Sequence, residues 1–118
     1  MEDVPQKRLP ARFFETEGGA IPVREWLLSL SDDDRKVIGQ DIMTAEFGWP
    51  IGMPLCRSIQ GRKGLWEIRS KLSDGRIARV FFCVDDGDMV LLHGFEKKSQ
   101  KTPNHEIETA VKRMKGLK

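Results

Sequence analysis

Residues 65–84, LWEIRSKLSDGRIARVFFCV, decide the fold because they contain two strand-like runs around one turn. A two-residue turn would scatter the apolar side chains over both faces of the hairpin. A three-residue loop over residues 73–75, with Gly75 in the left-handed conformation, sets Arg69 opposite Arg79. We predict the longer loop, because it gathers the apolar side chains on one face that helices can cover.

The predicted register gives the hairpin one apolar face and one charged face. The apolar face comprises Trp66, Ile68, Val80 and Phe82. The charged face comprises Glu67, Arg69, Lys71, Arg79 and Phe81. We expect the charged face to stay outside the core. Because like charges side by side destabilise a sheet, their grouping suggests an anionic ligand, and an aromatic ring among cations suggests stacking on a nucleobase.

The sequence around the hairpin predicts three more strands and three helices. Strand patterns cover residues 9–14, 55–59, 65–72, 76–84 and 89–97. Helical spacing of apolar residues follows Pro22, runs from a Ser31 cap to Gly48, and returns after Pro103. We predict an α+β fold in which a small antiparallel sheet packs against two N-terminal helices, with a C-terminal helix. At this length we expect a single domain over residues 1–118.

The acidic loop after Val84 sets the register of the last strand. Pairing Val84 with Met89 makes Lys98 extend the charged face and turns Lys97 away from it, unless a bulge intervenes. The same register points His93 toward the N-terminal helices. We therefore interpret His93 as a hydrogen-bonded core histidine rather than a catalytic one.

Hydropathy and cysteine content restrict the class of protein. The longest apolar runs are far shorter than the roughly 20 residues of a membrane helix, and no apolar signal segment follows Met1. Cys56 and Cys83 have dissimilar surroundings and form no CxxC or Cys/His pattern, so neither a disulfide framework nor a zinc site is predicted. We expect a cytoplasmic protein without a membrane partner, a metal or another cofactor.

Charge is distributed unevenly along the chain. The net charge of +2 combines six basic and ten acidic residues in residues 1–50 with fourteen basic and eight acidic residues in residues 51–118. The excess of positive charge therefore lies in the part that holds the predicted charged face. A phosphate-bearing partner is a plausible ligand for such a surface.

Three stretches carry a resemblance to a known family: LWEIR at residues 65–69, GRIARVFF at 75–82 and LLHGFEKKSQKTP at 91–103. Over roughly residues 8–116 the chain resembles the RelE/ParE toxin superfamily, in its HigB-like, phage-associated branch. The resemblance implies the toxin of a bacterial type II toxin-antitoxin pair. Most RelE and HigB members cleave messenger RNA in the ribosomal A site. It also implies a cognate antitoxin, commonly a helix-turn-helix DNA-binding protein.

The resemblance also implies which residues line the active face. Basic residues on the third and fourth strands and after the last strand correspond to the catalytic candidates Arg79, Arg69, Lys98 and Lys97. The RNA-binding candidates are Glu67, Lys71, Phe81 and Lys101. The arginines would hold phosphate oxygens, and proton transfer is open between either lysine and Glu67.

Two other functions remain open at this point. ParE-like members of the superfamily inhibit DNA gyrase by protein contact and cleave no RNA. A non-catalytic RNA-binding module would protect RNA rather than cut it. The fold alone does not separate these functions, but the cationic cluster favours the nuclease, because a gyrase inhibitor needs no phosphate-stabilising face.

Overall fold

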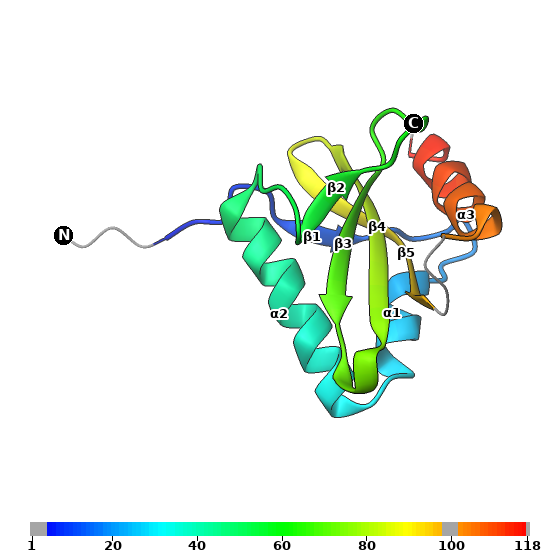
Figure 1. Cartoon of the computed structure of the whole chain (residues 1–118). Coiled ribbons are helices and arrows are strands. Elements are labelled where there is room, and N and C mark those ends of the chain that lie inside the picture. Colours follow the sequence, from blue (N-terminus) through cyan, green and yellow to red (C-terminus); the bar gives the residue numbers. More distant parts are fainter. Residues whose placement is uncertain (1–4, 98–101, 118) are drawn as a thin grey trace.

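The computed structural model describes residues 5–97 and 102–117 (Figure 1). Five strands and three helices follow one another along the chain. They are β1 (Ala11–Phe13), α1 (Pro22–Leu28), α2 (Asp32–Gly48), β2 (Cys56–Ser58), β3 (Trp66–Lys71), β4 (Ile77–Asp85), β5 (Asp88–Lys97) and α3 (Asn104–Lys115). The order of helices and strands agrees with the α+β fold predicted from the sequence.

The five strands form one sheet in the order β1-β5-β4-β3-β2. The strands from β2 to β5 are antiparallel to their neighbours, as predicted. β1 pairs in parallel with β5, so the sheet is mixed rather than purely antiparallel. The long stretch of chain between β1 and β5, which contains α1, α2 and the strands from β2 to β4, allows this parallel edge pairing, which a short hairpin could not form.

The hairpin of β3 and β4 has the predicted register. Arg69 lies opposite Arg79, and Ile68 lies opposite Val80. The turn between the strands spans Ser73–Gly75, and Gly75 has the expected positive φ of 74°. The three-residue loop is therefore confirmed, and it fixes which side chains share a face.

A bulge changes the register between β4 and β5. Val84 pairs with Met89 as predicted, but the pairing shifts by one residue between Phe81 and Phe82. Beyond the bulge Phe81 lies opposite His93, and Arg79 lies opposite Phe95. The prediction that His93 faces the N-terminal helices is therefore wrong.

The same bulge also corrects the expected direction of Lys97. Lys97 pairs with Ile77, two residues along from the pair of Phe95 with Arg79. Since side chains alternate along a strand, Lys97 shares the face of Arg79. Without the extra residue in β5, Glu96 would occupy that face instead.

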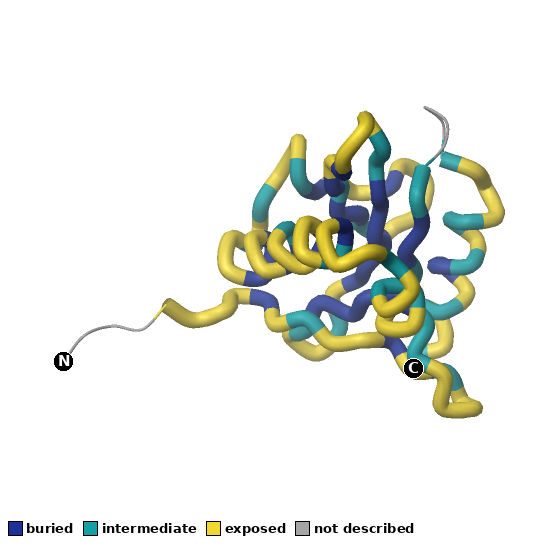
Figure 2. Tube along the Cα trace, turned by 90° about the horizontal axis from the view of Figure 1, so that it is seen from below, coloured by how far each residue is buried: buried dark blue, intermediate teal, exposed yellow. Residues whose placement is uncertain are grey.

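Helices cover both faces of the sheet, with one core on each side. α1 and α2 lie over the face that contains Ile68, Val80 and Phe82. α3 contributes Ala110 and Val111 to a second core on the other face. Figure 2 shows the buried strands between the largely exposed outer sides of the helices.

The second core overturns one prediction about the charged face. Phe81 is 0% exposed and belongs to the core beneath α3. A nucleobase cannot stack on this ring, so the interpretation of Phe81 as an RNA contact is wrong. The apolar stripe of α3 needs a surface to bury, and the part of the sheet around Phe81 provides it.

An ion pair joins the start of α2 to the end of the β3–β4 turn. Arg76 donates two hydrogen bonds to Asp34, at 2.9 Å from Nη1 to Oδ2 and 3.0 Å from Nη2 to Oδ1. The amide of Asp34 in turn donates to the hydroxyl of Ser31, which caps α2.

No helix in the described part of the chain is long and apolar enough to cross a membrane.

Candidate functional site

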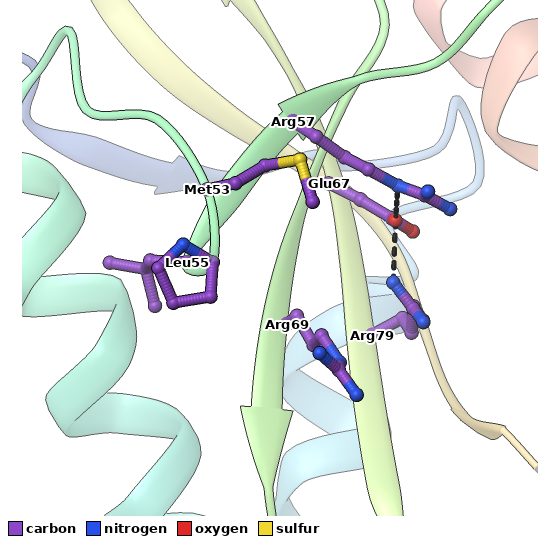
Figure 3. Close-up of a pocket in the computed structure, with 7 residues that line it drawn as sticks. Met53, Leu55, Arg57, Glu67, Arg69 and Arg79 are labelled. Atoms are coloured by element: carbon purple, nitrogen blue, oxygen red, sulfur yellow. Dashed lines mark hydrogen bonds and ion pairs between the residues drawn. The ribbon is translucent and has the colours of Figure 1, made fainter.

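Four basic side chains from four different strands meet beside the core that α3 covers. Arg57 comes from β2, Arg69 from β3, Arg79 from β4 and Lys97 from the end of β5. Pairing of the strands brings them together, because Arg57 lies opposite Glu67 and Arg69 lies opposite Arg79. Figure 3 shows Arg57 and Arg79 joined to the carboxylate of Glu67, with the side chain of Arg69 beside Arg79.

Glu67 is the buried carboxylate that pairs with two arginines of this cluster. One carboxylate oxygen, Oε1, accepts hydrogen bonds from Nη1 of Arg79 at 2.6 Å and from Nε of Arg57. Its side chain is 0% exposed. The carboxylate holds two guanidinium groups in place, as a buried charge must have hydrogen-bonded partners. A contact between Glu67 and RNA stays a prediction.

Arg79 is buried, which is unusual for an arginine. The residue is only 6% exposed, and burial lowers the pKa of its guanidinium. Glu67 opposes this effect on the pKa, whereas the charges of Arg57 and Arg69 add to it. Among the described residues, Nε of Arg79 has no hydrogen-bond partner. A buried donor without a partner favours a ligand that accepts its hydrogen bond.

Arg69 carries a positive charge that nothing in the described part of the chain neutralises. Its guanidinium forms no ion pair with the carboxylates of residues 5–97 and 102–117, and its buried Nε has no partner there. Arg69 and Arg79 have the same charge and occupy directly opposed positions, which is unfavourable without an anion between them. This pair is the part of the cluster best suited to bind phosphate.

Lys97 lies within the field of all three arginines. Burial lowers the pKa of its ammonium group, and the charge of Arg79 lowers it further. Arg57 and Arg69 contribute in the same direction, and Glu67 alone raises it. A lysine with a lowered pKa is a better proton donor.

Two adjoining cavities open beside the cluster. The smaller, of about 60 Å³, suits a group the size of a phosphate. It is lined by Met53, Pro54, Leu55, Arg57, Glu67, Arg69 and Arg79. The larger, of about 340 Å³, lies between α2 and β3 and is lined by Val37, Asp41, Pro54, Leu55, Arg69 and Lys71. Arg69 borders both cavities.

The structure brings together some of the residues that were chosen from the sequence. Arg69, Arg79 and Lys97 are in the cluster, and Lys71 is exposed at the larger cavity. Lys98 and Lys101 lie outside the described residues. Within the described ranges, no group of three or more His, Cys, Asp or Glu side chains is arranged to hold a metal ion.

Sequence reasoning missed Arg57. The signal that could have found it is the predicted strand at residues 55–59, whose antiparallel pairing with β3 sets Arg57 opposite Glu67. The loop between β2 and β3 contains two glycines, Gly61 and Gly64, and gave no unique pairing. Only the folded chain shows which strand neighbours the carboxylate.

His93 lies on the same face as Arg79 but is occupied by other contacts. Its Nε2 is 2.9 Å from Oε1 of Glu106, and its Nδ1 is 3.3 Å from Nη1 of Arg113. Arg113 also donates to the backbone carbonyl of Leu92. Both ring nitrogens are satisfied, so these contacts attach α3 to β5.

Comparison with known proteins gives one family. Residues 25–115 match the family described as phage derived protein Gp49-like (DUF891). The match covers α2, α3, the strands from β2 to β5 and every described residue of the cluster. No curated protein shows a significant match to the chain.

Proposed function

Because the chain belongs to the Gp49-like family of phage-derived proteins, we propose that it is the toxin of a type II toxin-antitoxin pair and acts as an endoribonuclease on messenger RNA. One observation carries the proposal: Arg69 and Arg79 occupy directly opposed positions of β3 and β4 and line one small cavity. The RelE/HigB resemblance of the sequence supports the same activity.

The charge of the site favours a phosphodiester. Four cations, Arg57, Arg69, Arg79 and Lys97, surround the single carboxylate of Glu67. The remaining positive charge lies in a partly desolvated recess, where electrostatic interactions are stronger than in bulk water. A bound phosphate would relieve the repulsion between the arginines and satisfy their unpartnered donors.

The reaction that fits these groups is attack by the RNA itself. The 2′-hydroxyl loses its proton to solvent water as its oxygen forms a bond to phosphorus, and the bond from phosphorus to the 5′-oxygen breaks, which leaves a 2′,3′-cyclic phosphate and a 5′-hydroxyl. Arg69 and Arg79 would stabilise the extra negative charge of the phosphorane. Lys97 would donate the proton that the leaving 5′-oxygen needs. The side chains themselves neutralise the phosphorane, and no metal ion is part of the proposal.

The proposed partners follow from this activity. Messenger RNA on the ribosome would be the substrate, so the protein would act in the cytoplasm. The antitoxin would be a helix-turn-helix DNA-binding protein, as the family resemblance implies. Covering the cationic cluster would be the simplest way for it to block the toxin, because the cluster attracts phosphate.

The test is a translation reaction that contains the purified protein, with the ends of the message mapped by primer extension. We expect new ends that require the protein, and their dependence on ribosomes shows where it acts. Arg69→Ala should reduce the cleavage rate about 10²–10³-fold through loss of a charge-stabilising donor. Arg24→Ala, which removes an exposed arginine from α1, is the matched control and should cleave normally.

Three outcomes would contradict the proposal. Protection of the message without cuts would indicate a non-catalytic RNA-binding module. Inhibition of DNA gyrase without cuts would indicate a ParE-like toxin. Equal cleavage by Arg69→Ala and Arg24→Ala would show that the arginine pair is not the site.

A further inference from the structure

The larger cavity has a shape and position that the proposed cleavage chemistry does not use. β2 pairs with β3 as far as Cys56 and Ile68, and one further backbone hydrogen bond runs from the N–H of Arg69 to the carbonyl of Leu55. Beyond it, the end of β3 around Lys71 extends past β2 along α2. The cavity of about 340 Å³ opens at this uncovered edge. Its volume is at the lower end of the ~300–1,000 Å³ of small-molecule sites, so it suits one ring system.

The walls of this cavity combine apolar and charged groups. Val37 of α2, with Pro54 and Leu55 before β2, provides apolar surface for a flat ring. Asp41 of α2 faces the cavity from one wall, and Arg69 and Lys71 line it from β3. The cavity therefore offers an acceptor and two cations on different sides of an apolar pocket.

Asp41 does not pair with the cations that share its cavity. Within residues 5–97 and 102–117, its carboxylate forms no ion pair within 4.0 Å and no side-chain hydrogen bond. Nε of Arg69 is likewise buried without a partner in that part of the chain. Separated opposite charges of this kind suit a ligand that carries hydrogen-bond donors at one end and a phosphate at the other.

We propose that this cavity is a base-binding subsite that selects guanine in the RNA next to the phosphate held by Arg69 and Arg79. This inference rests on the proposed function. Arg69 borders both cavities, so a strand whose phosphate occupies the smaller cavity can place a neighbouring base in the larger one. Single-stranded RNA is commonly read in this way, by bases that leave the stack and enter protein pockets.

Guanine is the base whose edge fits a carboxylate. Its N1–H and N2–H₂ groups lie side by side and can donate two parallel hydrogen bonds to the two oxygens of Asp41. Adenine and cytosine present one amino group beside a ring nitrogen acceptor on that edge. Uracil presents one N–H between two carbonyl oxygens, which a carboxylate repels. Asp41 would therefore discriminate against the other three bases.

The direct test uses the isotope-labelled full chain and four ribonucleoside monophosphates. Amide chemical shifts are followed during titration with GMP, AMP, CMP and UMP in parallel. We expect GMP to bind most tightly, with the largest shifts around Asp41 and Leu55. Asp41→Asn should weaken GMP binding about 10–100-fold, as expected for loss of a charged hydrogen-bond acceptor. Asp33→Asn, an exposed aspartate on the same helix, is the control and should keep the preference.

A second variant keeps the test independent of Asp41. Val37→Phe adds bulk to the apolar wall at a position that is partly exposed on α2, so the fold should persist. It should weaken all four nucleotides, since it fills the ring pocket without changing the acceptor. Equal binding of the four nucleotides to the native chain, or a GMP preference that survives Asp41→Asn, would overturn the subsite.

The mapped cleavage ends separate this inference from the proposed function. If both hold, guanine is enriched beside the cut and Asp41→Asn removes the enrichment while cuts continue elsewhere. Cuts with no guanine enrichment in the native protein would refute the subsite and leave the nuclease standing. A GMP preference at Asp41 in a protein that never cuts RNA would refute the nuclease and leave a guanine-binding pocket.

Discussion

At the scale of single residues, the two opposed arginines are not equivalent. Arg79 is buried and bonded to Glu67, whereas Arg69 has no ion pair within the described residues. Removing Arg69 therefore leaves no buried carboxylate without a partner. Removing Arg79 would remove a donor to the proposed phosphate and would also take one partner from the buried carboxylate of Glu67. Arg69 is for this reason the better residue for testing catalysis.

Arg79→Ala should lose stability as well as cleavage. We expect a loss of about 3 kcal/mol in the free energy of unfolding, the lower end of the range for a broken buried pair, because Arg57 still faces Glu67. Urea unfolding of the variant, of Arg69→Ala and of the native chain measures the difference. If Arg79→Ala were as stable as Arg69→Ala, the contact with Glu67 would have no structural weight.

Glu67→Gln should change the pH dependence of cleavage. The charge of Glu67 raises the pKa of Lys97 against burial and the arginines, so its removal lowers that pKa further. If Lys97 donates the proton, activity falls as pH rises through its pKa. The alkaline limb of the pH–rate profile should then move to lower pH in Glu67→Gln. Glu108→Gln, which alters an exposed ion pair with Arg62, is the control and should leave the alkaline limb in place. If the alkaline limb does not move in Glu67→Gln, Lys97 is not the proton donor.

At the scale of the elements, the packing of α1 against β5 depends on Gly94. A Cβ at Gly94 would lie 2.3 Å from a ring carbon of Trp26. β5 can therefore approach the indole only because residue 94 has no side chain. The bulge creates this arrangement, because it turns Gly94 toward α1 and pairs it with Val80.

Gly94→Ala should destabilise the protein by about 1–3 kcal/mol, the usual cost of overpacking a filled core. Gly39→Ala is the control, since a Cβ there meets nothing within 4 Å and the residue lies inside α2. That change should stabilise the protein by about 0.5–1 kcal/mol through helix propensity. Thermal or urea unfolding measures both, and an Ala at position 94 without cost would contradict the close packing described here.

The elements also show which parts of the fold the sequence could predict. The register of β3 and β4 was predictable, because only one loop length gathers Ile68, Val80 and Phe82 on one face. The bulge in β5 was not, because Val90, Leu91 and Leu92 are all buried and give no alternating pattern. Burial on both faces hides the register, so the directions of His93 and Lys97 were mispredicted.

The residues of the candidate site also divide into those that the local sequence predicts and those that it does not. Arg69 and Arg79 were found from local pairing, which a hairpin determines over a short stretch of chain. The covering of Phe81 by α3 and the approach of Arg57 depend on contacts between distant segments. Such contacts are fixed by packing of the whole chain, and the sequence pattern of one hairpin does not contain them.

At the scale of the whole molecule, the ion pair of Asp34 and Arg76 joins α2 to the hairpin that carries the site. Hydrogen bonds from Arg76 lower the pKa of Asp34, and burial opposes them. The pair therefore stabilises the fold above the ordinary pKa of an aspartate. Its contribution should be lost as pH falls through the lowered pKa of Asp34.

Asp34→Asn should consequently be less stable than the native chain at neutral pH, with a difference that shrinks in acid. Unfolding by urea at pH 7 and at about pH 3, below the ordinary pKa of aspartate, measures this change. Asp33→Asn, which alters an exposed neighbour, should show a smaller dependence on pH. A constant difference between Asp34→Asn and the native chain at both pH values would rule out the proposed linkage.

The bulge in β5 has a consequence for the sign of charge in the site. Glu96 and Lys97 are neighbours with opposite charges, and only one of them can face the arginines. Because side chains alternate along a strand, the number of residues between the β4–β5 turn and this position decides which of the two faces the arginines. The one extra residue in β5 thus decides whether a cation or an anion completes the cluster. Insertion or deletion of one residue around position 92 would exchange the two without changing Arg57, Arg69 or Arg79.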